Sequence, residues 1–103
     1  MARPMRIRAT DQDGVIDVKI LMSHIMETGQ RTDGDGNVIP AHFIQEVTAT
    51  CNGKEVLRAE WGPPVSRDPF LGFKFKGAKA EDKIEVTWLD NKGDTRTDTV
   101  EIR

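Results

Sequence analysis

The sequence lacks several features that mark whole classes of protein. Its 103 residues contain a single cysteine, Cys51, so no disulfide can form within the chain. Uninterrupted apolar runs last only a few residues, as at 20–22, whereas a membrane-spanning helix needs about 20. The first ten residues, MARPMRIRAT, are positively charged but lack the apolar segment of a secretory signal peptide. Taken alone, these absences predict a cytoplasmic protein.

An excess of one charge sign is also missing. Lysine and arginine number 15 and aspartate and glutamate number 17, which gives a net charge of -2. Non-specific nucleic-acid binding needs a broad basic field, which this balance does not provide. The local excess at Arg3, Arg6 and Arg8 is read as a solvated strand face rather than a docking patch. The length predicts one domain, residues 1–103, with a modest core.

The chain does contain short segments in which apolar and polar residues alternate, the period of a half-buried β-strand. This alternation predicts strands at about 5–10, 15–22, 41–51, 55–61, 71–76, 84–88 and 95–102. Turn residues separate them, and Asn52-Gly53 is the strongest hairpin signal because a type I′ turn needs positive φ at both positions. Near Ile44 and Gln45 the alternation slips, which predicts either a β-bulge or a face that contacts something besides water. About seven strands without any helical period predict an all-β, antiparallel sandwich.

Two connections are longer than simple turns, and on such a scaffold function is expected in irregular loops. One is the proline-rich segment WGPPVSRDP at 61–69. The other lies within 21–47, which holds both histidines and two of the four methionines. Its Leu21, Ile25, Met26, Val38, Ile39 and Phe43 are more apolar than a solvated turn requires. They predict either packing beneath the loop or a surface that contacts another chain.

Metal sites are weakly indicated. The run Asp33-Gly-Asp-Gly-Asn37 imitates the start of a calcium loop, but the required Gly and Glu are replaced by Val38 and Ile44. A turn is therefore expected there. His24, His42 and Cys51 are the candidate soft-metal ligands, but their spacing matches no familiar motif. The two histidines could meet only if their strands are neighbours.

No convincing catalytic group is found. Cys51 could act as a nucleophile with a histidine, but its phase with Val47 and Ala49 predicts a small buried thiol. Ser23 and His24 are adjacent, and adjacent strand side chains point to opposite faces, which argues against a Ser-His couple. We therefore expect a non-enzymatic protein with no cofactor.

Several segments together resemble the SoxZ family. They are His24-x-Met26-Glu27-Thr28-Gly29-x-Arg31, Ile39-Pro40-Ala41-His42-Phe43-Ile44, Trp61-Gly62, Val65-Ser66, Pro69, Phe73-Lys74-Phe75-Lys76-Gly77 and Trp88-x-Asp90-Asn91-x-Gly93. The match extends over most of the chain from about residue 16. Two positions depart from the family pattern: Ile25 stands where proline is usual, and Asp68 where asparagine is usual.

The resemblance implies an immunoglobulin-like sandwich that forms a heterodimer with SoxY, the subunit that carries sulfur intermediates on a cysteine in thiosulfate oxidation. It implies transient contacts with other Sox enzymes. It also implies a periplasmic location, reached by export together with SoxY. The expected partner-binding residues are Ile25, Met26, Glu27, Thr28, Gly29, Arg31, Ile39, Pro40, His42 and Phe43.

Three functions remain as hypotheses. The first is a non-catalytic subunit that helps SoxY present its carrier cysteine to Sox enzymes. The second is a small thiol enzyme that uses Cys51 with a histidine. The third is a free-standing binding sandwich without a fixed partner.

Overall fold

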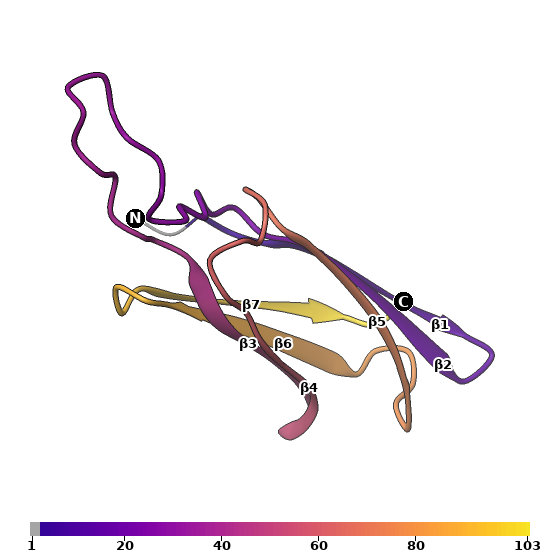
Figure 1. Cartoon of the computed structure of the whole chain (residues 1–103). Helices are drawn as coiled ribbons and strands as arrows, with labels where there is room; N and C mark the ends of the chain where they lie inside the picture. The colour runs from indigo at the N-terminus through magenta and orange to yellow at the C-terminus, as the bar shows by residue number, and fades with distance from the viewer. Residues whose placement is uncertain (1–2) are drawn as a thin grey trace.

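Seven antiparallel strands form two sheets in the computed structural model, which describes residues 3–103 (Figure 1). The three-stranded sheet has the order β1-β2-β5 and the four-stranded sheet the order β4-β3-β6-β7. The strands are β1 (Arg6–Gln12), β2 (Val15–Leu21), β3 (Ile44–Cys51), β4 (Lys54–Glu60), β5 (Phe70–Lys76), β6 (Lys83–Asp90) and β7 (Thr95–Glu101). The predicted all-β sandwich is confirmed.

The core lies between the two sheets and follows from the alternation in the strands. Ile16, Val18 and Ile20 of β2 are fully buried, as are the inward-facing residues of β3 and β6. Trp88 is the largest of these buried side chains. Burial of such alternate positions from both sheets supplies the apolar contact that holds a sandwich together.

Two local predictions are confirmed in detail. Asn52 and Gly53 have φ values of 53° and 83°, as a type I′ hairpin between β3 and β4 requires. The pairing of β3 with β6 shifts register between Ile44 and Glu46. This bulge buries Ile44 while Gln45 is exposed, which explains the slip in the sequence pattern.

The connection between β2 and β3, residues 22–43, forms a long projection that we call the arm. It extends from one end of the sandwich in Figure 1 and returns on itself. Isolated bridges join Glu27 to His42 and Thr32 to Val38, so its two legs pair like an irregular hairpin. Because residues 41–43 belong to the second leg, β3 starts at Ile44 and not near Ala41 as the sequence predicted.

The tip of the arm is the turn expected in place of a calcium loop. The Asp33 carboxylate accepts hydrogen bonds from the backbone amides of Asp35 and Asn37, at 2.9 and 3.0 Å. An aspartate that bonds amides a few residues ahead is a common device for closing a turn. Among residues 3–103 no helix could cross a membrane.

Candidate functional site at the base of the arm

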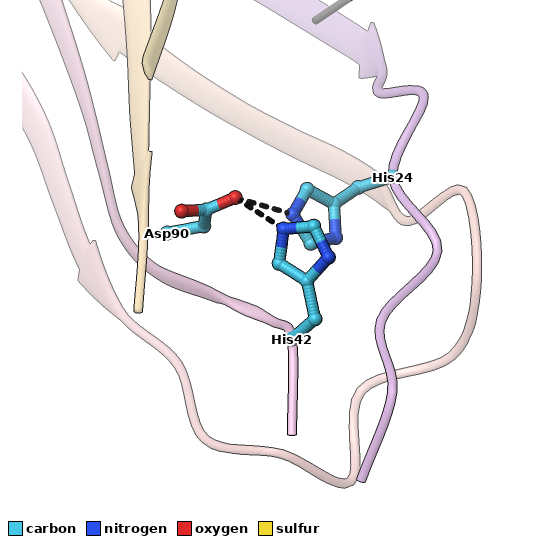
Figure 2. Close-up of side chains that lie close together, drawn as sticks. All are labelled: His24, His42 and Asp90. Atoms are coloured by element: carbon cyan, nitrogen blue, oxygen red, sulfur yellow. Dashed lines mark hydrogen bonds and ion pairs between the residues drawn. The ribbon is translucent and has the colours of Figure 1, made fainter. Parts of the chain in front are cut away.

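Two histidines and an aspartate meet where the arm joins the sandwich. His24 Nε2 lies 3.0 Å from Asp90 Oδ2, and His42 Nε2 lies 2.7 Å from the same oxygen (Figure 2). His24 belongs to the first leg of the arm, His42 to the second, and Asp90 ends β6. We call these three residues the base cluster. It joins both legs of the arm to the four-stranded sheet.

Hydrogen bonds around the base cluster fix its proton positions. His24 Nδ1 accepts the amide hydrogen of Met26 at 3.1 Å, so the ring proton sits on Nε2 and is donated to Asp90. The other carboxylate oxygen, Oδ1, accepts the amides of Lys92 and Asp94, each at 2.9 Å. Both oxygens of Asp90 therefore face only donors.

The ionised form of Asp90 is favoured in spite of its burial. Burial alone raises the pKa of Asp90, but hydrogen bonds from His24, the Asp94 amide, His42 and the Lys92 amide together hold the pKa below its usual value. With 2% of its surface exposed, Asp90 is a buried carboxylate whose charge is stabilised by four donors. Breaking this set leaves a buried charge without partners.

The base cluster is also the one group of three potential metal ligands among residues 3–103, with its ligand atoms within 4.8 Å of one another. The bond from the Met26 amide opposes a metal at His24. A metal on Nε2 would displace the proton to Nδ1, where the amide hydrogen of Met26 already points. Metal-bound histidines normally donate from the second nitrogen instead. The arrangement therefore fits a hydrogen-bonded anchor better than a metal centre.

Further contacts fix each leg. Asn91 Oδ1 accepts the Phe43 amide at 2.8 Å, and Asn91 Nδ2 donates to the Ala41 carbonyl at 2.9 Å. On the first leg, Arg31 makes two hydrogen bonds to the Glu27 carboxylate, at 2.6 and 3.1 Å. Hydrogen bonding to Arg31 lowers the pKa of the buried Glu27 carboxyl. The second leg is thus bonded to the turn that follows β6, and the first leg is braced by an ion pair within it.

Asp68, where the family usually has asparagine, keeps a structural role in the proline-rich connection. Its Oδ1 accepts the His24 amide at 3.0 Å, and its own amide donates to the His24 carbonyl at 2.9 Å. Its φ of 50° is left-handed, a conformation that aspartate and asparagine tolerate better than most residues. The acceptor oxygen that asparagine would supply is therefore retained by the aspartate.

The expected partner-binding residues divide into two groups. Met26 and Glu27 are buried in the domain itself, and the Met26 sulfur accepts the Ile44 amide at 3.3 Å. The others are at least partly exposed: Ile25, Thr28, Gly29, Arg31, Ile39, Pro40, His42 and Phe43. A partner can reach this second group directly, whereas Met26 and Glu27 could act only by shaping the arm.

Cys51 lies apart from the histidines. It is the last residue of β3, at the end of the sandwich away from the arm, and the length of the strand from Ile44 to Cys51 is more than about 20 Å. The side chain is buried, and this burial, with the charge of Asp82, raises the pKa of the Cys51 thiol. The structure brings His24 and His42 together, as a metal or catalytic site would require, but leaves Cys51 out.

Asp90 is the residue of the base cluster to which sequence reasoning gave no role. A signal was present, because Asp90 continues the buried phase of Ile84, Val86 and Trp88 along β6. A charged residue at such a position is rarely buried without partners. Its partners could not be named, because His42 and His24 lie 48 and 66 positions away in the sequence.

The sequence matches the family described as sulphur oxidation protein SoxZ over residues 5–101. The chain belongs to the SoxZ family. This membership confirms the resemblance that the motifs indicated and supports a role in a sulfur-oxidation system. No curated protein sequence matches the chain.

Solved structures extend the comparison at the level of the fold. A hypothetical protein, PH1083, from Pyrococcus horikoshii OT3 aligns with a TM-score of 0.64 at 16% identity, covering 99% of this chain and 89% of that one. The superoxide reductase (neelaredoxin) from Ignicoccus hospitalis gives 0.63 at 15% identity, covering 99% and 80%. That from Archaeoglobus fulgidus gives 0.52 at 22% identity, covering 95% and 84%. At such identities the SoxZ chain shares their fold, and the likeness says nothing about activity.

Proposed function

We propose that this SoxZ chain is the non-catalytic subunit of a sulfur-carrier heterodimer. It binds SoxY and helps present the carrier cysteine of SoxY to Sox enzymes during thiosulfate oxidation. The observation that carries the proposal is the arm, a long projection anchored by buried hydrogen bonds that nevertheless exposes apolar side chains. A projection held rigid before binding loses less conformational entropy when a partner covers it.

The exposed apolar residues of the arm support contact with another chain. Ile25 is 46% exposed and Val38 61% exposed, although both lie on a segment whose backbone is fixed by pairing. Ile39 and Phe43, on the second leg, are partly exposed. Apolar residues at the centre of a contact and charged residues around it are the usual composition of a protein interface.

A hollow beside the second leg extends this surface onto the four-stranded sheet. It encloses about 420 Å³ and is lined by Phe43, Trp61, Leu89 and the adjoining Gly62 and Pro63. Carboxylates lie at its rim, namely Glu46 and Glu60. The arm and this hollow together form the proposed SoxY-binding surface, with an aromatic and aliphatic floor that suits a partner's apolar side chains.

The position of Met26 changes the role proposed for it. Because Met26 is 5% exposed and bonds Ile44, truncating it is expected to loosen the base of the arm rather than remove a direct contact. Phe43 can act both on stability and on binding, since it packs against the core and also lines the hollow. Variants that test binding should therefore be placed at Val38 and Phe43, with stability measured in parallel.

A catalytic role for Cys51 is not supported by its surroundings. The thiolate is the reactive form, and the raised pKa of the buried thiol reduces its population at neutral pH. We expect native Cys51 to resist alkylation until the protein is unfolded, as mass spectrometry after iodoacetamide treatment would measure. Rapid labelling of the folded protein at neutral pH would instead favour the thiol-enzyme hypothesis.

The periplasm is the proposed location, with export of the chain in complex with SoxY. The proposal rests on the family resemblance. Cell fractionation in the presence and absence of SoxY tests it. We expect the chain in the periplasmic fraction only when SoxY is expressed with its own export signal.

The SoxY-binding proposal is tested by mixing the purified chain with SoxY from the same organism and measuring mass by light scattering after gel filtration. A 1:1 complex is expected. Val38→Asp places a charge in the proposed contact and should weaken the complex by about tenfold or more. Val15→Asp, at the end of β2 away from the arm, makes the same change outside the proposed contact and should leave the complex intact. If the Val38 variant and the wild type elute equally with SoxY, the arm is not part of the interface.

A further inference from the structure

The outer face of the three-stranded sheet carries a concentrated positive charge. Strand pairing places Arg8 opposite Lys19, and Lys19 opposite Gly72, on the same side of the sheet. Alternation along the strands puts the other basic residues on that side as well. We call this surface the basic face; its cations are Arg6, Arg8, Lys19, Lys74 and Lys76, and Asp17 is its single acidic strand residue.

The basic face also contains an apolar hollow. Phe70 is 63% exposed and Leu21 43% exposed, and the register pairs these two residues across β2 and β5. Together with Ile7 they line a depression of about 250 Å³, which has Arg6, Arg8 and Lys19 at its margin. A depression of this size accommodates one apolar side chain surrounded by cations.

Gly72 lies near the exposed ring of Phe70. A Cβ built on Gly72 would lie 3.4 Å from Cε1 of Phe70, an ordinary van der Waals contact. Gly72 also sits next to Lys19 in the sheet.

The opposite sheet has the reverse charge. Register places Glu46, Glu60, Glu85 and Glu101 on its outer face, among threonines and with Arg58 and Lys83 as the cations. Arg58 is already engaged by Glu46 at 2.8 Å and by Glu55 at 3.1 Å. A chain with a net charge of -2 therefore separates its charges between two faces. Such separation orients partners according to their own charge.

We propose that the basic face docks an acidic segment of a second protein, with one apolar side chain of that segment in the hollow. Carboxylates of the segment meet Arg6, Arg8 and Lys19, while Phe70 and Leu21 contact its apolar residue. Its hollow lies on the three-stranded sheet and the hollow beside the arm lies on the four-stranded sheet, although Leu21 in its lining directly precedes the arm. It extends the proposed function by giving the subunit a second, charge-selective contact.

The composition of the face favours a protein segment over a nucleic acid or a lipid surface. Nucleic acids bind to continuous basic tracts, whereas Asp17 interrupts this one and the molecule as a whole is acidic. An anionic membrane would be attracted by the cations but would be repelled by the acidic remainder of the chain. A small hollow with a cationic margin matches an apolar residue flanked by carboxylates.

The test uses a fluorescein-labelled synthetic peptide of twelve residues, glutamate and aspartate with one central leucine, titrated with the full chain and followed by anisotropy. Binding should weaken as sodium chloride rises from 50 to 300 mM, because salt screens exposed charges. The double variant Arg8→Glu with Lys19→Glu should weaken binding about tenfold or more. Lys83→Glu on the opposite sheet is the control and should bind like the wild type.

The hollow is tested separately from the charges. Phe70→Ser should weaken binding of the leucine peptide about threefold to tenfold, the range for losing one apolar contact. The same variant should bind a peptide in which serine replaces the leucine about as tightly as the wild type does. NMR shift mapping on the wild type should show the changes at β1, β2 and β5, which avoids dependence on any variant's stability.

Three results would overturn the proposal. The first is that the double variant at Arg8 and Lys19 binds the peptide as tightly as the wild type does. Another is a twelve-base single-stranded DNA, or vesicles of phosphatidylserine and phosphatidylcholine, that bind the wild type as tightly as the peptide. The third is self-association through the acidic face of a second copy, detected by sedimentation and abolished by the same variants. The SoxY complex is measured separately with the Val38 variant, so failure of the acidic-segment proposal can be told from failure of the SoxY-binding proposal.

Discussion

At the scale of single residues, Asp90 determines how the base of the arm is held. Its carboxylate accepts hydrogen bonds from two histidines through Oδ2 and from two backbone amides through Oδ1. No neutral side chain of the same shape offers acceptors in both directions. The residue therefore has a structural role that its acidic character alone would not reveal.

Asp90→Asn tests this role. In either orientation the amide nitrogen of asparagine would face donors, either the two histidine Nε2 atoms or the amides of Lys92 and Asp94. We expect the free energy of unfolding to fall by about 2–4 kcal/mol, measured by urea denaturation. Asp35→Asn at the exposed tip of the arm is the control and should change stability by less than about 0.5 kcal/mol. Equal stability of both variants would show that the base cluster contributes little.

Protonation of Asp90 in acid should remove the stabilisation that its hydrogen bonds provide. The native pKa of Asp90 lies below its ordinary value of 3.8, so the stabilising effect is complete above that pH and is lost as pH falls through the lower native value. The pKa of Asp98 is also lowered, mainly by its hydrogen bonds from Arg96, so its protonation in acid further reduces the stability of the wild type and of the variant alike. Urea denaturation of the wild type and Asp90→Asn should show a stability gap that is constant near neutrality and narrows below about pH 4. A gap that stays constant down to pH 2.5 would contradict this assignment.

At the scale of elements, the arm depends on close contact between its legs. Gly29 has a φ of 86°, and a Cβ there would lie 3.1 Å from the Cβ of Ala41 on the other leg. Both facts favour glycine, the first through backbone conformation and the second through space. The legs thus meet where the bridge between Glu27 and His42 closes the arm.

Gly29→Ala separates these two effects when it is compared with Gly36→Ala. Gly36 has a similar φ of 83°, but a Cβ there would meet nothing within 4 Å. Each variant carries the backbone cost of about 1 kcal/mol, and only Gly29→Ala adds crowding of about 1 kcal/mol or more. We expect a larger fall in melting temperature and faster amide exchange at Glu27 and His42 for Gly29→Ala. Equal effects of the two variants would mean that the legs are not tightly packed.

Sequence periodicity was sufficient to predict the individual strands but not to predict how they pair in the two sheets. The seven strands, the bulge at Ile44 and the Asn52-Gly53 hairpin all follow from local patterns that span a few residues. The pairing of β2 with β5 does not, because about fifty residues separate strands that alternation describes identically. The arm's extension to Phe43 was missed for a related reason, since apolar residues there continue the pattern of β3.

The candidate site shows the same division. Irregular loops and an apolar surplus located the region, and His24 and His42 were considered as possible metal ligands, but Asp90 was given no role. The base cluster required three-dimensional information, because β3, β4, β5 and most of β6 separate His42 from Asp90 in the sequence. Local sequence cannot show that Met26 turns inward while Ile25, its neighbour, is exposed. The φ of Met26 is 51°, so the backbone is irregular at the residue that turns inward.

At the scale of the whole molecule, the chain is an elongated sandwich with extents of 54 × 20 × 20 Å and functional surfaces assigned to different sides. The arm connects the two sheets, and the adjoining hollow lies on the four-stranded sheet, whereas the basic face belongs to the three-stranded sheet. A subunit built this way could hold one partner and contact another at the same time. On the proposed function, the part of the chain in sulfur oxidation is to hold these partners.

Hydrogen–deuterium exchange of the chain, alone and bound to SoxY, tests the central claim most directly. Amide protection reports which backbone segments a partner covers or stabilises. We predict added protection across residues 22–43 and around Trp61 and Leu89, with β1 and β5 unchanged. Protection confined to the β1-β2-β5 sheet, or none within the arm, would contradict the account.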